Sequence, residues 1–214
     1  MKSYRLFLTA AVLSVPLLQP AAQAQITADL AYGTGTAHAP STGASINTFS
    51  DGVLYNTSSI HGAFGKVSGD VMFKPWLGVG ADYTWRYSQG AYAGLGYRPS
   101  FYDINAVFRP GAGLGNRKIE PEFQAGLGGM RIGFSQNQTF CNSFTGCSSS
   151  SDHVGSSEHF QVHGLAAVRL YVTRSVFVRP EVEVHWVNNL FQFGSNWVPQ
   201  YGVSLGYSFG RGRS

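Results

Sequence analysis

The most constraining feature of this sequence is a period-two alternation of apolar residues with small or polar ones, which recurs in about eight segments. Successive side chains of a β-strand point to opposite faces, so this alternation predicts strands with one apolar face. Each segment has, or can be extended to, about ten residues, the length of a tilted strand that crosses a bilayer. The segments are residues 26–32, 63–73, 77–87, 102–108, 119–127, 160–172, 176–186 and 197–209.

The acidic residues indicate which face of these strands meets lipid, because a charge facing hydrocarbon is destabilising. Of the 11 acids, Asp51, Asp152 and Glu158 lie in expected loops, and all the others lie on the face opposite to the apolar one. A soluble β-sandwich, the alternative, would turn its charges to solvent and gives no reason for aromatic residues at strand ends. The pattern favours an all-β fold, an eight-stranded antiparallel up-and-down transmembrane β-barrel, over residues 25–209.

The N-terminal segment has the order of a secretory signal peptide, which is basic, then apolar, then small. Met1-Lys-Ser-Tyr-Arg5 is basic, residues 6–18 are apolar, and Ala22-Gln-Ala24 precedes the expected cleavage between Ala24 and Gln25. The apolar run is shorter than the roughly 20 residues that a membrane-spanning helix needs. We therefore expect residues 1–24 to be removed.

The connections between the predicted strands are alternately short and long, as in outer-membrane barrels. Residues 74–76, 110–118 and 173–175 are short or moderate in length. Gly111-Ala-Gly-Leu-Gly115 lies in one of them and is expected to be a turn, because no helix follows it as a nucleotide-binding loop would require. The long polar segments, residues 37–60 and 135–158, are expected outside the cell together with residues 88–93 and 188–196.

The last predicted strand carries the most specific motif of the chain. In Tyr201-Gly-Val-Ser-Leu-Gly-Tyr-Ser-Phe209, the residues Tyr201, Val203, Leu205, Tyr207 and Phe209 alternate with small ones. This segment resembles the C-terminal assembly signal of the small outer-membrane β-barrel proteins, whose relatives include the OmpA membrane domain and OmpW-like proteins. The resemblance implies residence in the bacterial outer membrane, contact with its lipid, and recognition by the barrel-assembly machinery. Residues 210–214 follow Phe209 as a short C-terminal tail.

The face opposite to the apolar one would line the barrel interior, which in an eight-stranded barrel is only wide enough for side chains to fill. Buried charges must be paired, so we expect an ion-pair network there. Its predicted members are Lys66, Asp70, Asp82, Arg86, Asp103, Arg109, Glu120, Glu122, Arg169, Arg179, Glu181, Glu183 and His185.

The histidines are not expected to form a metal or catalytic site. Residues two apart on a strand are separated by about 6.6 Å, which is far for joint chelation by Glu181, Glu183 and His185. His159 and His163 are four apart, about 13 Å along a strand, which excludes a helical chelating pair. The sequence therefore predicts no metal, no cofactor and no catalytic residues.

The remaining charges and the cysteines narrow the class of protein further. Without Lys2 and Arg5, 13 basic residues face 11 acids, and no basic run exceeds Arg117-Lys118, so a nucleic-acid partner is not expected. Cys141 and Cys147 lie in a loop that secretion exposes to an oxidising compartment, which predicts a disulfide.

Three functions are compatible with this barrel. We expect a non-enzymatic integral protein with a structural or surface-interaction role, acting through residues 37–60 and 135–158, because loops on a rigid scaffold usually carry recognition. A narrow, porin-like channel for small, even apolar, solutes is an alternative that needs interior gaps at Gly78, Gly80, Gly126 and Gly128. A lipid-modifying enzyme is another, for which residues 148–151 and Asp152-His153 supply Ser and His.

Overall fold

The computed structural model describes residues 26–112, 118–142 and 146–210. The predicted signal peptide, its cleavage between Ala24 and Gln25, and residues 211–214 of the tail lie outside the described residues.

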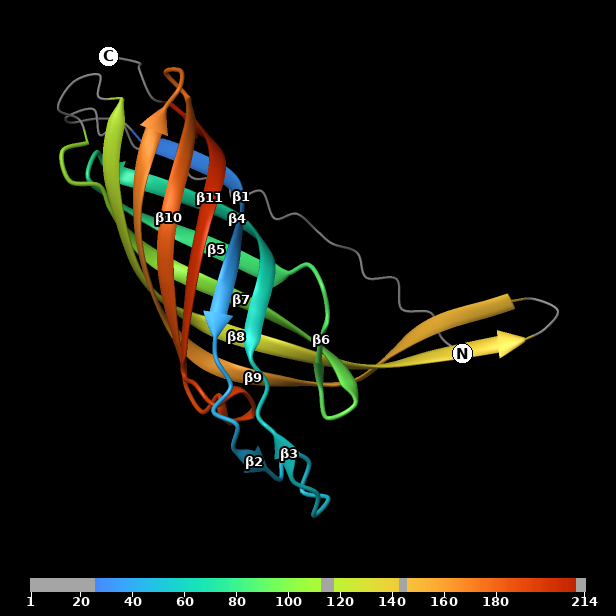
Figure 1. The fold of residues 1–214 in the computed structure, drawn as a ribbon. Coiled ribbons are helices and arrows are strands. Elements are labelled where there is room, and N and C mark those ends of the chain that lie inside the picture. Colours follow the sequence, from blue (N-terminus) through green and yellow to red (C-terminus); the bar gives the residue numbers. More distant parts are fainter. Residues whose placement is uncertain (1–25, 113–117, 143–145, 211–214) are drawn as a thin grey trace, which may run out of the picture.

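Eight long antiparallel strands form a closed barrel (Figure 1), so the predicted fold class is confirmed. Each strand pairs with the next along the chain, and β11 pairs with β1, which closes the ring. The strands are β1 (Thr27–Ala39), β4 (Ile60–Lys74), β5 (Leu77–Arg86), β7 (Leu95–Phe108), β8 (Ile119–Asn142), β9 (Gly146–Tyr171), β10 (Val176–Val187) and β11 (Trp197–Phe209). Four short elements, β2 (Ser45–Ile46), β3 (Tyr55–Asn56), β6 (Gly90–Tyr92) and the 3-10 helix η1 (Phe191–Phe193), lie in the connections.

The outer surface of the barrel is apolar and aromatic. Ile104, Leu127 and Leu205 are each more than half exposed, and the residues of the assembly motif also point outward. Because the wall alternates in this way, the apolar side chains meet lipid while the polar ones fill the interior. Among the described residues, no helix is both long enough and apolar enough to cross a membrane.

The end of the barrel that carries the long connections, predicted to face outside the cell, is closed by apolar side chains, which we name the extracellular cap. Loop residues contribute to it as well as strands, since Leu190 and Phe193 around η1 are fully buried there. Phe49 of the β2–β3 loop contacts the rings of Tyr92 and Phe134. The buried members of the cap are Ala37, Ala39, Ile60, Phe64, Tyr92, Tyr97, Phe101, Met130, Ile132, Phe134, Val187, Leu190, Phe193 and Val198.

The cap explains why two strands begin or end elsewhere than the sequence predicts. β7 starts at Leu95 rather than residue 102, because its inward residues Tyr97 and Phe101 are apolar members of the cap. In β8 the inward residues Met130 and Ile132 are apolar as well, so the alternation loses its contrast after residue 127. The strand nevertheless continues to Asn142.

The prediction of a loop at residues 135–158 is wrong, because β8 and β9 continue through this segment as a hairpin. The pairing of β8 with β7 ends at Ser135, and that of β9 with β10 ends at Gln161. Beyond these points residues 136–142 and 146–152 pair only with each other in the described chain, and we name this segment the ribbon. Figure 1 shows the ribbon projecting away from the barrel wall. Asp152 and Glu158, expected in a loop, therefore lie in a strand.

Arg131 of β8 lies on the outer face, on the same side of the strand as Leu127. The β8–β9 register is regular around Arg131, and an irregularity follows between Phe134 and Ser135. Arg131 stands opposite Glu158, and the two exposed side chains approach to 4.0 Å between Nε and Oε1. The outward arginine is thus matched by an outward acid at the extracellular side of the wall.

Candidate functional site: the barrel interior and the ribbon

The interior nearest the short turns, which are predicted to be periplasmic, is an ion-pair cluster around Glu122 of β8, which is fully buried. Its carboxylate accepts hydrogen bonds from Arg109 Nε at 2.8 Å, Arg179 Nη1 at 2.9 Å and Arg169 Nε. Asp29 and Asp70 bridge two of the same guanidinium groups: Arg169 Nη1 lies 2.7 Å from Asp29 and Nη2 lies 2.8 Å from Asp70. Each charge in this cluster is therefore neutralised by several opposite ones.

The next layer, at mid-depth, is centred on Lys66 of β4. Its Nζ donates to Glu183 Oε2 at 2.5 Å and lies 3.6 Å from Glu181 Oε1. Glu181 also accepts a hydrogen bond from Ser204 at 2.8 Å and lies beside Arg179, with 2.9 Å between Oε2 and Nε. Glu181 thus links the two layers.

All thirteen residues that the sequence assigns to the interior network are buried. Two of them form no ion pair in the described chain: Asp82 accepts a hydrogen bond from the Asn105 amide, and Arg86 lies apart from the acids. Arg86 lies under the cap with its guanidinium 5.3 Å from the Tyr97 ring centroid, and its Nε and Nη1 have no hydrogen-bond partner in the described chain. The side chains that point inward around Arg86 are apolar. The alternation along one strand does not reveal this, because it says only which residues point inward.

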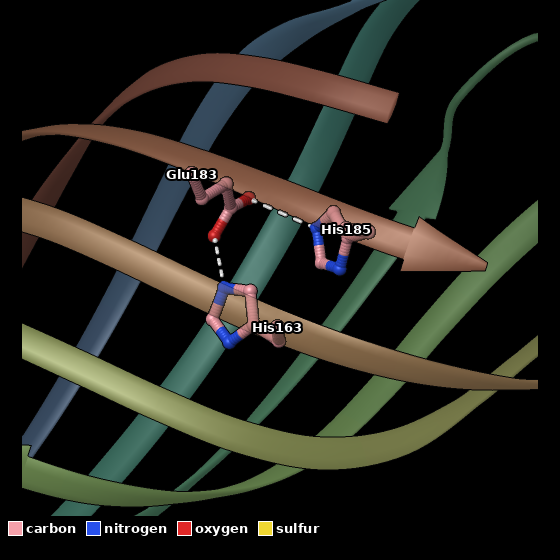
Figure 2. Close-up of side chains that lie close together, drawn as sticks. All are labelled: His163, Glu183 and His185. Atoms are coloured by element: carbon pink, nitrogen blue, oxygen red, sulfur yellow. Dashed lines mark hydrogen bonds and ion pairs between the residues drawn. The ribbon is translucent and has the colours of Figure 1, made fainter. Parts of the chain in front are cut away.

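Two histidines and one acid lie close together in the interior (Figure 2). Glu183 is bonded to Lys66 and His185 stacks on Phe101 of the cap, so the group lies between the Lys66 layer and the cap. Glu183 and His185 come from β10, and His163 comes from β9, directly opposite His185. His163 Nε2 lies 3.2 Å from Glu183 Oε2, and His185 Nε2 lies 3.8 Å from Glu183 Oε1. The two imidazole rings are stacked with centroids 4.7 Å apart and planes at 17°.

Spacing along one strand did not predict this group, because His163 arrives by cross-strand pairing. The side chains also turn toward one another, so that their ligand atoms all lie within 4.8 Å. These are residue types that hold a borderline transition metal. The signal that could have found the group is the β9–β10 hairpin turn, which fixes the register of His163 against His185.

The interior glycines serve close packing and leave no gaps of the kind that the channel alternative needs. A Cβ atom added to Gly126 would lie 1.8 Å from Asn105 Oδ1, and one on Gly128 would lie 1.8 Å from the Tyr102 carbonyl oxygen. At Gly78 and Gly80 the nearest atoms would be at 2.5 and 3.2 Å. A small cavity lies beside Lys66 and Glu183 between β1 and β11, with room for about one water molecule.

The ribbon carries mostly small, uncharged polar side chains and a disulfide. Cys141 and Cys147 are directly paired across it and bonded. Asp152 and His153, the residues considered for an enzyme, are neighbours in a strand, where successive side chains point to opposite faces. They are therefore poorly placed to orient each other as an acid and a base would need.

Comparison with solved structures places this architecture among known proteins. The chain is similar to the Yersinia pestis attachment invasion locus protein Ail, which was solved in complex with a heparin analogue. The match has a TM-score of 0.50 and 14% identity, and it covers 86% of this chain and 99% of that one. Neisserial surface protein A matches with a TM-score of 0.55 and 16% identity over 86% of this chain and 96% of that one. The fold of the present chain is that of the small outer-membrane β-barrels.

A third similar structure is the outer-membrane protein OprG of Pseudomonas aeruginosa, with a TM-score of 0.52 and 13% identity over 85% of this chain and 95% of that one. No protein-family model matches the sequence, and no curated protein matches it either. The prediction of an outer-membrane β-barrel is confirmed by these similarities, which concern the fold.

Proposed function

We propose that this chain is a non-enzymatic outer-membrane protein that makes surface contacts through the ribbon. The observation that carries the proposal is the contrast between a filled barrel and a projecting ribbon whose two strands pair with each other and with no other strand of the described chain. Ion pairs fill the periplasmic half of the interior, and the extracellular cap closes the other end. These features leave the extracellular elements as the part of the molecule that is available to a partner.

Along residues 136–141 and 146–152, the outer edges of the ribbon have no neighbouring strand in the described chain. An edge strand presents unpaired N–H and C=O groups, and proteins commonly protect such edges with Lys, Pro or bulges. Residues 136–142 and 146–152 contain neither Lys nor Pro. The ribbon can therefore accept an extended segment of a partner by strand addition, with its Ser side chains adding hydrogen bonds.

The charge of the ribbon restricts the kind of partner. No Lys or Arg occurs between Arg131 and Arg169, so the ribbon offers no strong site for a polyanion. Ail was solved with a sulfated heparin analogue, and the present ribbon is chemically different from what such a ligand needs. We infer an uncharged or weakly charged partner that is recognised through hydrogen bonds.

A ribbon truncation tests the proposal. Gln136 and Asp152 are directly opposite, so joining them through Asn-Gly gives a two-residue hairpin turn without disturbing the barrel. The mature protein and this variant, both in nanodiscs, are compared for binding to arrayed glycoproteins and glycans, after heat-dependent gel mobility shows that both are folded. We expect binding by the mature protein and at least a tenfold loss in the truncated one. Equal binding by the two would assign the contacts to another surface.

A Cys141→Ser/Cys147→Ser variant is the matched control, because it keeps the full length of the ribbon. It should retain most of the binding of the mature protein. A loss as large as that of the truncation would show that the shape of the tip, and not the paired ribbon, is what the partner recognises.

A further inference from the structure

We propose that His163, Glu183 and His185 bind one divalent transition-metal ion, such as Zn²⁺, inside the barrel. His163 and His185 would supply Nε2 and Glu183 would supply Oε1 (Figure 2). The three residues are at most 5% exposed. The proposal concerns the interior and is independent of the ribbon.

The hydrogen bonds of Asn105 fix the tautomer of His163. The side-chain nitrogen Nδ2 of Asn105 donates to Asp82 Oδ2 at 2.6 Å, so its oxygen Oδ1 is the atom that faces His163 Nδ1 at 3.1 Å. Because that oxygen only accepts, His163 Nδ1 carries the hydrogen. Its Nε2 is then free to be a ligand, the arrangement that metal-binding histidines usually have.

The free Nε2 of His163 faces another acceptor. It lies 3.2 Å from Glu183 Oε2, and two acceptors at that distance repel unless a positive charge lies at the contact. His185 also lacks compensation, since neither of its ring nitrogens has a hydrogen-bond partner among the described residues although His185 is only 1% exposed. Both rings therefore need either a proton or a metal ion.

The surrounding charges also call for a cation. In the described chain, eight buried acids face five buried Lys and Arg residues. Near the histidines the imbalance is concentrated, because Asp82 and Asp103 are opposite each other and accept from the amides of Asn105 and Gln161 rather than from a cation. Asp103 Oδ2 lies 4.0 Å from His185 Nδ1. Buried negative charge of this kind needs compensation.

A single metal ion compensates these charges better than two protons. Two imidazolium rings stacked with centroids at 4.7 Å would repel each other in a poorly solvated interior. Phe101 stacks on the other face of His185 at 4.5 Å and keeps water away from it. One divalent ion would instead place two positive charges next to the Glu183 carboxylate. Lys66 would keep its contacts with Glu183 Oε2 and Glu181 Oε1.

The side chains require only short movements to reach such a geometry. Ligand atoms around a tetrahedral zinc ion lie about 3.3 Å apart, which follows from bonds of about 2.0–2.1 Å. His185 Nε2 lies 3.8 Å from the ligand atom Glu183 Oε1, and His163 Nε2 lies 3.2 Å from Oε2, the other oxygen of the same carboxylate. The ligand atoms of the three residues all lie within 4.8 Å of one another. The donor set of two imidazoles and one carboxylate selects Zn²⁺ or Co²⁺ over Mg²⁺ or Ca²⁺.

The test is the metal content of the mature protein after folding with a stated ion. The protein is folded into detergent micelles with Zn²⁺ or Co²⁺, treated with EDTA, and assayed by elemental analysis, with the visible spectrum of Co²⁺ as a second readout. We expect about one ion per chain, retained in EDTA because the cap and the ion-pair cluster enclose the site. Folding without metal and adding it afterwards should give much lower occupancy.

Matched variants separate this site from adventitious binding. His163→Asn keeps a donor toward Asn105 but removes Nε2, and we expect it to lose at least nine-tenths of the bound metal. His159→Asn, at a histidine bonded to Ser157 at the barrel rim, should bind as the unmodified protein does.

Two results would overturn the proposal: a folded unmodified protein that retains no ion, which would leave protonated histidines as the compensating charges, or equal metal content in His163→Asn. If His163→Asn does not fold, the Co²⁺ spectrum of the unmodified protein decides. Bands typical of tetrahedral nitrogen and oxygen coordination support the site, and their absence rejects it.

Discussion

Glu122 is the residue on which the interior charge arrangement depends most, because three guanidinium groups converge on one fully buried carboxylate. Breaking a buried pair by removing one partner leaves an uncompensated charge and costs about 3–5 kcal/mol. We therefore expect Glu122→Gln to lower the free energy of unfolding by about 3 kcal/mol. Urea titration of the folded barrel in detergent micelles measures the change.

Glu158→Gln is the matched control for that substitution. Its partner Arg131 is exposed and 4.0 Å away, and pairs of this kind contribute about 0–1 kcal/mol. A destabilisation by Glu122→Gln no larger than that of the control would show that water compensates the interior arginines.

The extracellular β2–β3 loop contains a carboxylate that makes its local order depend on pH. Asp51 accepts the Val53 N–H at 2.9 Å and the Tyr55 hydroxyl at 2.8 Å, and these bonds lower the pKa of Asp51 below its ordinary value of 3.8. A lowered pKa means that the contribution to stability is present above the unfolded value and is lost as the pH falls through the folded one.

We expect a carboxyl NMR titration of the folded protein to give a pKa below 3.8 for Asp51, with the chemical shift of Tyr55 following the same transition. Asp51→Asn should abolish the transition at Tyr55. A pKa at or above the ordinary value would mean that the two hydrogen bonds are not formed in solution.

At the scale of elements, the ribbon and the barrel should behave as separate units. The disulfide joins Cys141 and Cys147 across the ribbon, away from the barrel wall. Thiol labelling of the unreduced protein should therefore find no free thiol. Reduction should leave the barrel's unfolding midpoint unchanged while it increases protease cleavage within residues 136–152. A lowered midpoint would contradict this independence.

The strands differ in how well the sequence predicts them, and the reason lies in the inward face. β10 and β11 alternate clearly over nearly their whole length, because polar residues such as Glu181 and Ser204 point inward there. β7 and β8 were predicted too short, since Phe101 and Ile132 point inward into the cap and remove the contrast between the faces.

The parity of a residue, meaning its odd or even position in the alternation along a strand, predicts which side chains point into the barrel. It does not predict which residues these side chains contact. Parity places Glu183 and His185 inward, yet only the β9–β10 register brings His163 against them. Likewise, parity places Arg86 inward without revealing that it lies under an apolar cap. The depth of a residue in the barrel depends on strand tilt and register, which a single strand's sequence does not contain.

The whole molecule should not conduct ions. The interior combines the Glu122 cluster, the Lys66 layer and the cap, and its glycines are packed against neighbouring strands. We expect no discrete conductance steps from the mature protein in a planar bilayer. Heat-dependent gel mobility of the same preparation serves as the control for folding. Regular steps of constant size would revive the channel alternative.

The pairing of β1 with β11 has a consequence for how the molecule assembles. Ala28 lies opposite Phe209, so the contact that closes the ring joins residues from nearly opposite ends of the chain. Contacts this distant in sequence form slowly, whereas the hairpins between consecutive strands can form locally. The growing sheet must therefore keep one edge of β1 open until β11 arrives. Ring closure should be the late, rate-limiting event of folding. The chain should therefore be most prone to aggregation just before the ring closes, while the edge of β1 is still open.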